Sequence, residues 1–172
     1  MFIYIYNIKM ENICRDNKLK FFKMLDGNIY DLRIADNHVE IASYYKINIK
    51  IKSLLKDYYQ KIYVNNLKNI DSVSYAIYLI SNQRYWEAHE VLENIWRNKN
   101  GIIKKTYQFI ILLCVANIHK QRGHIETYYR VIKRAMKINT LDKIENIDIK
   151  LIKYKFSMDE NYNIDVYFKQ IM

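Results

Sequence analysis

Residues 84–96, with the sequence RYWEAHEVLENIW, decide the fold of this chain because their apolar positions recur with the period of an α-helix. Each helical residue turns about 100° from the last, so the apolar residues should share one side, which faces a core. That side carries Tyr85, Ala88, Leu92, Ile95 and Trp96. The segment therefore predicts a core-facing helix.

The same helix places ionisable residues on and around its apolar side. His89 projects near the middle of the apolar arc and Glu93 from its edge, one turn further on, whereas Glu87 and Glu90 should point elsewhere. An unpaired ionisable group in a core costs several kcal/mol or shifts its pKa. We therefore expect a partner for both His89 and Glu93.

The partner of this pair is open to three interpretations. His119, on the next predicted helix, would complete a triad of two histidines and one carboxylate that suits a divalent metal. Alternatively, a buried hydrogen bond from His89 to Glu93, with Trp96 Nε1 nearby, fixes the packing of the helices. The third interpretation is a ligand-binding pocket. The spacing HEVLE differs from the HExxH pattern of metalloproteases, so a metal site needs the second histidine from another helix.

The N-terminal third predicts a small β-α-β-β-α unit over residues 1–64. β-Branched and aromatic residues favour strands, and an apolar stripe with a helical period favours helices. The strands are expected at 2–8, 29–35 and 38–43, and the helices at 16–25 and 47–63.

Residues 65–71 (NNLKNID) are polar and form the expected boundary with an all-α part. Helical patterns follow, each ended by polar or glycine residues. They cover residues 72–80, 84–98, 102–122 and 124–138. The fold class is thus α+β, with a three-helix bundle over residues 72–138 and a helical tail of one or two short helices over 139–172.

The motifs YWEAHEVLENIW and HKQRG, in this order and spacing, resemble the family labelled domain of unknown function 309 over about residues 72–138. The resemblance implies a compact three-helix core and no established activity. It also implies that the polar residues of the family correspond to His89, Glu90, Glu93 and His119. Residues expected to be structural are Tyr85, Trp86, Leu92, Trp96 and Gly123.

The chain is strongly basic, with a formal net charge of +10, which favours a polyanionic partner. A stripe of four cations with the spacing i, i+3, i+4, i+7 lies opposite the apolar side of the 124–138 helix. It consists of Arg130, Lys133, Arg134 and Lys137. This stripe could follow the phosphates of a nucleic acid. Its alternative is an ordinary solvated face of a lysine-rich protein.

The sequence also indicates the cellular compartment of the protein. Cys14 and Cys114 lie far apart and lack metal-ligand spacing, which favours a reducing environment. The longest wholly apolar run, residues 109–116, is too short to cross a bilayer, and residues 1–10 lack the pattern of a signal peptide. We therefore expect a cytoplasmic protein with no membrane partner.

These patterns favour a non-enzymatic binding or scaffold protein whose partner is a nucleic acid or an acidic protein. The first alternative is a metal-dependent enzyme that uses His89, Glu93 and His119, with a divalent metal as its cofactor. A second alternative is a subunit of a homo- or hetero-oligomeric assembly. No glycine-rich phosphate loop and no serine nucleophile motif occurs in the sequence, which disfavours nucleotide-binding and hydrolase functions.

Overall fold

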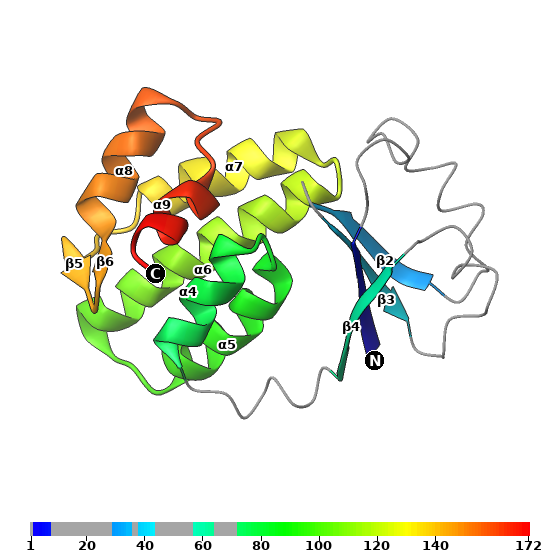
Figure 1. Cartoon of the computed structure of the whole chain (residues 1–172). Helices are drawn as coiled ribbons and strands as arrows, with labels where there is room; N and C mark the ends of the chain where they lie inside the picture. Colours follow the sequence, from blue (N-terminus) through cyan, green and yellow to red (C-terminus); the bar gives the residue numbers. More distant parts are fainter. Residues whose placement is uncertain (1, 8–28, 36–37, 44–56, 64–71) are drawn as a thin grey trace. The chain divides into compact units, whose positions relative to one another are not determined.

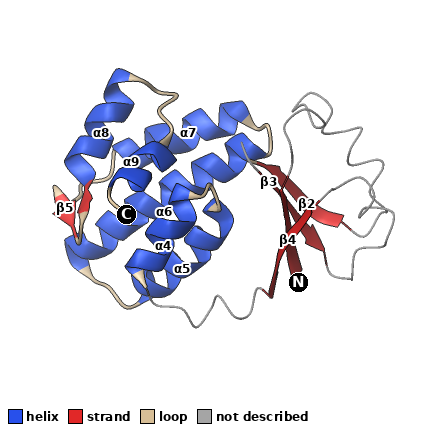
Figure 2. Cartoon of the chain, in the orientation of Figure 1, coloured by secondary structure: helices blue, strands red, loops and turns tan. Residues whose placement is uncertain are grey.

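The computed structural model describes residues 2–7, 29–35, 38–43, 57–63 and 72–172. The chain divides into two compact units, residues 1–66 with 121–123 and residues 67–120 with 124–172. The described residues of the first unit are mainly strands, and helices dominate the second unit (Figure 2). The predicted α+β class is confirmed.

The first unit contains a four-stranded antiparallel sheet with the strand order β2-β3-β1-β4. Its strands are β1 (Phe2–Asn7), β2 (Ile29–Ile34), β3 (His38–Ser43) and β4 (Asp57–Tyr63). The predicted hairpin of β2 and β3 is confirmed, and the amide of Ala35 donates to the carbonyl of His38 at 2.9 Å to close it. The helix expected at residues 16–25 lies outside the described residues.

A helix was expected over residues 47–63, of which the structure describes residues 57–63. For these residues the prediction was wrong, because they form the strand β4. Asp57–Tyr63 pairs as a strand with β1. The misleading signal was the spacing of four between Tyr58 and Ile62. Residues four apart share a face in a strand as well as in a helix, and the aromatic segment DYYQKIY has high strand propensity.

The second unit contains six helices among the described residues (Figure 1). They are α4 (Val73–Ser81), α5 (Tyr85–Arg97), α6 (Gly101–Gln121), α7 (Ile125–Met136), α8 (Ile149–Met158) and α9 (Ile164–Gln170). Within residues 72–138 the structure thus has four helices, because the short segment after Ser72 also packs as a helix. The side chain of Ser72 accepts from the amide of Tyr75 and caps α4.

A short hairpin in the tail had no sequence signal. β5 (Lys143–Ile144) and β6 (Ile147–Asp148) have two residues each, so alternation of apolar and polar residues cannot reveal them. Glu145 takes a positive φ of 52° in the turn between them. The hairpin leads directly into α8.

α6 is the central helix of the second unit. Its middle is apolar all round, and Phe109, Ile110, Leu113 and Cys114 are fully buried. Among the described residues α6 is the one helix long and apolar enough to cross a membrane, yet 56% of its most apolar window is buried within the protein. Such burial is typical of a core helix.

The tail completes this core. Residues 139–172 belong to the same compact unit as α4 to α7. α8 and α9 contribute fully buried side chains to the common hydrophobic cluster. They are Ile149, Ile152, Phe156, Ile164, Tyr167 and Phe168. α9 packs against α4, so the last described helix covers the first one of this unit (Figure 1).

Candidate functional site

The core-facing side of α5 differs from the predicted one by a rotation about the helix axis. Ala88, Val91 and Leu92 are fully buried, as is the carboxylate residue Glu87. Val91 was absent from the predicted arc, and including it moves the centre of the arc toward Glu87 and away from His89. The predictions that Glu87 points away from the core and that His89 lies in the middle of it were therefore wrong.

His89 and Glu93 are half-buried at the edge of the core-facing side of α5 and do not lie in the hydrophobic core. The side chain of His89 is 21% exposed and that of Glu93 is 33% exposed. His89 Nε2 lies 3.4 Å from Glu93 Oε1, and His89 Nδ1 lies 3.3 Å from Glu90 Oε1 without hydrogen-bond geometry. Glu93 also accepts from the exposed guanidinium of Arg97 at 3.0 Å. The cluster is a chain of local contacts along one helix.

His119 lies in the last turn of α6, where its ring faces that of His124 with 5.8 Å between centroids. The structure pairs His89 with Glu93 and does not bring His119 into a ligand group with them. Within the described part of the chain, no three His, Cys, Asp or Glu side chains are placed to hold a metal ion. The triad thus gains no geometric support there.

An ion pair that the sequence did not suggest lies at the start of α5. Arg84 Nε donates to Glu87 Oε1 at 2.9 Å, and its terminal nitrogen donates to the other carboxylate oxygen. Both side chains are 5% exposed or less. Their i, i+3 spacing in the sequence predicts an ion pair, but it predicts a buried one only if Glu87 is assigned to the core-facing side. This bidentate pair stabilises the turn that orients α5.

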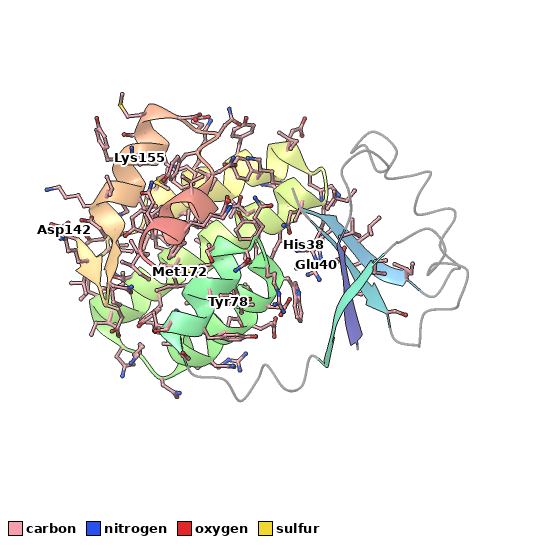
Figure 3. The ribbon with its side chains drawn as sticks, viewed as in Figure 1. His38, Glu40, Tyr78, Asp142, Lys155 and Met172 are labelled. Atoms are coloured by element: carbon pink, nitrogen blue, oxygen red, sulfur yellow. The ribbon has the colours of Figure 1, made fainter. Side chains whose placement is uncertain are left out.

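A second buried charge pair crosses the β2–β3 hairpin. Arg33 and Glu40 are opposite each other in the register, with 2.8 Å between Arg33 Nε and Glu40 Oε2. His38, two residues from Glu40 on the same strand, lies 3.4 Å from its other oxygen (Figure 3). The sequence predicted the hairpin but not this pair, because register decides which residues meet.

Burial holds the thiol of Cys114 and the hydroxyl of Tyr128 in their protonated forms. Burial strongly raises the pKa of the Cys114 thiol, which keeps it protonated at neutral pH. Burial likewise raises the pKa of Tyr128 to about 12, and its hydroxyl donates to the carbonyl of Glu160 at 3.0 Å. Both residues act in packing.

Most of the residues expected to be structural take part in the core. Leu92 is buried, and Tyr85 is buried and donates from its hydroxyl to Asp165 at 3.2 Å. Trp86 and Trp96 are partly buried against the core, and Lys104 Nζ lies 4.3 Å from the centre of the Trp96 ring. Gly123 adopts a positive φ of 80°, a backbone conformation that glycine takes without strain and other residues rarely adopt.

The four cations of the predicted stripe form one exposed face of α7. Arg130, Lys133, Arg134 and Lys137 are all exposed, whereas Tyr128, Ile132 and Ala135 on the opposite face are buried. None of the four has a carboxylate partner among the described residues. Arg130 makes one weak contact, 3.5 Å to Thr127 Oγ1. No ion pair in the described part of the chain neutralises these four cations, and the one exposed carboxylate of α7 is Glu126 in its first turn.

Comparison of the chain with curated proteins and with solved structures finds no match. A comparison with family models does find one. Its matched segment holds α4, α5, α6 and the beginning of α7. The function of this family is not established. Residues 73–131 match the family described as Domain of unknown function (DUF309), which confirms the resemblance predicted from the AHEVLENIW motif.

Proposed function

We propose that this protein binds nucleic acid through the exposed face of α7, in the cytoplasm and without catalysing a reaction. The observation that carries this proposal is the uncompensated stripe Arg130, Lys133, Arg134 and Lys137. At a rise of 1.5 Å per residue the stripe extends over about 10 Å, comparable with about three nucleotides of one strand.

The composition of the α7 face favours phosphates over a protein surface. Its exposed residues are charged or polar apart from Ile125 at the first turn, which is 45% exposed. Stable protein interfaces need a buried apolar or aromatic centre, whereas phosphate binding needs exposed lysine and arginine. Such a face fits the sugar-phosphate backbone.

The segment that follows the stripe runs to the first turns of α6, which carry a further exposed lysine. The amide of Leu141 donates to Thr106 Oγ1 at 3.0 Å, which brings the chain after Lys137 to the first turns of α6. The exposed Lys105 lies next to Thr106 in that region. We therefore propose Lys105 as a further phosphate contact.

The experiment is fluorescence anisotropy with a labelled single-stranded RNA, a single-stranded DNA and a DNA duplex over a range of KCl concentrations. The test variant is Arg130→Glu with Arg134→Glu. Its matched control is Lys150→Glu with Lys155→Glu, which makes the same charge change on exposed residues of α8.

We expect the α7 variant to bind about tenfold more weakly. The slope of its log affinity against log KCl concentration should correspond to about two fewer phosphate contacts, while the control stays close to the wild type. Equal weakening by both variants would show that net charge alone drives binding. Absence of binding at low salt would also contradict the proposal.

A further inference from the structure

α8 carries an exposed apolar ridge that lies outside the segment matched by the family model. Leu151 is 39% exposed, Tyr154 57% and Met158 71%. On the opposite side of the helix, Ile149, Ile152 and Phe156 are buried in the core. α8 is thus held by one face, and the ridge lies on the other.

The ridge has the spacing of a coiled-coil seam. Leu151, Tyr154 and Met158 are separated by three and then four residues, as at the a, d and a positions of a heptad repeat. In that register Lys150 takes a g position and Lys155 an e position, so one lysine lies on each side of the ridge. Both are exposed, and Figure 3 labels Lys155 on this helix.

The charges beside the ridge decide which partner fits. Neither Lys150 nor Lys155 forms an ion pair in the described part of the chain. In coiled coils the e and g residues select a helix of opposite charge. A second copy of α8 would bring lysines against lysines, whereas glutamates on a partner helix would pair with both.

The helix is also ordered before any partner arrives. Asp148 caps its N-terminus, where its carboxylate accepts from the amide of Leu151 at 2.8 Å, and this bond lowers the pKa of Asp148. The Lys153 ammonium turns inward and donates to the carbonyl of Ile138 at 2.7 Å. Preordering of the docking face reduces the entropy lost on association.

We propose that the exposed face of α8 docks an acidic amphipathic helix of a partner protein, with apolar residues at its a and d positions and glutamates at e and g. This site is separate from the nucleic-acid surface proposed on α7 and does not depend on it. The two faces differ in kind, since the α7 face is charged and the α8 face is an apolar ridge between lysines.

The test uses a fluorescein-labelled peptide of about three heptads with leucine at a and d and glutamate at e and g, whose own charges keep it monomeric. A second peptide has lysine in place of each glutamate. Binding of both to the full chain is measured by anisotropy, and circular dichroism checks that every variant keeps its helical content.

We expect the glutamate peptide to bind the wild type and the lysine peptide not to bind. Lys150→Glu with Lys155→Glu should weaken the glutamate peptide about tenfold or more and should gain affinity for the lysine peptide. Tyr154→Ala with Met158→Ala should weaken binding without a change of charge. Arg130→Glu with Arg134→Glu on α7 is the charge-matched control and should leave peptide binding close to that of the wild type.

Three results would overturn the proposal. The first is equal binding of both peptides, or binding of neither. The second is binding to phosphatidylserine vesicles that needs Tyr154 and Met158 while the peptide fails, which makes the ridge a lipid contact. The third is self-association of the wild type in sedimentation that Tyr154→Ala with Met158→Ala abolishes, which makes a second copy the occupant.

Discussion

At the scale of single residues, the two charge pairs of α5 show that burial changes how much an ion pair contributes to stability. Arg84 and Glu87 are buried and bidentate, whereas the half-buried Glu93 pairs with the exposed Arg97 near the other end of the helix. Exposed pairs contribute at most about 1 kcal/mol to stability. Removing one member of a buried pair leaves an uncompensated charge and costs far more.

We predict that Glu87→Ala lowers the free energy of unfolding by about 3–5 kcal/mol, because the change removes both charge-assisted hydrogen bonds between Glu87 and the buried Arg84 guanidinium. Urea denaturation followed by circular dichroism measures this loss. Glu93→Ala is the matched control on the same helix and should cost less than about 1 kcal/mol. Equal losses for the two variants would show that the Arg84 pair is no more important than a surface pair.

At the scale of elements, the sequence predicts α4 to α7 well because the signals for a long amphipathic helix are local. The stripe on α7 was predictable for the same reason, since its four cations repeat within one helix. Two local signals were missed: the high strand propensity of DYYQKIY in β4, and Val91, which moves the apolar arc of α5 toward Glu87. Strand register depends on distant residues, so the pairing of β4 with β1 was not predictable. The sequence predicts short helices over residues 139–172 but not which side of α8 faces outward, and the structure shows that the ridge does.

α9 tests how much the tail contributes to stability, because one of its faces is buried and the other is exposed. Phe168 is fully buried, while Val166 on the same helix is 44% exposed. We predict that Phe168→Ala costs about 3–5 kcal/mol of unfolding free energy through the cavity it leaves. Val166→Ala should stay within about 0.5 kcal/mol of the wild type.

Thermal or urea unfolding of the two α9 variants checks this difference. A small loss for Phe168→Ala would mean that α9 detaches from the core at little cost. In that case the tail is an accessory of the helical unit rather than a part of its core.

At the scale of the whole molecule, the helical unit has a single hydrophobic cluster that extends from Ala76 to Phe168. We predict that a fragment of residues 67–172 folds by itself, with a cooperative urea transition. A fragment of residues 67–142 should lack one, because it omits the six core residues supplied by α8 and α9. A cooperative transition in the shorter fragment would contradict this.

The carboxylate of Asp165 has a consequence for the order in which the chain folds. It accepts from Gln83 Nε2 and from the hydroxyl of Tyr85, both at 3.2 Å and both about eighty residues earlier. During synthesis the residues of α4, α5 and α6 are all added before this carboxylate. Contacts so distant in sequence delay completion of the native state. We therefore expect the earlier helices to keep part of their apolar surface exposed until α9 has been synthesised and packs against α4.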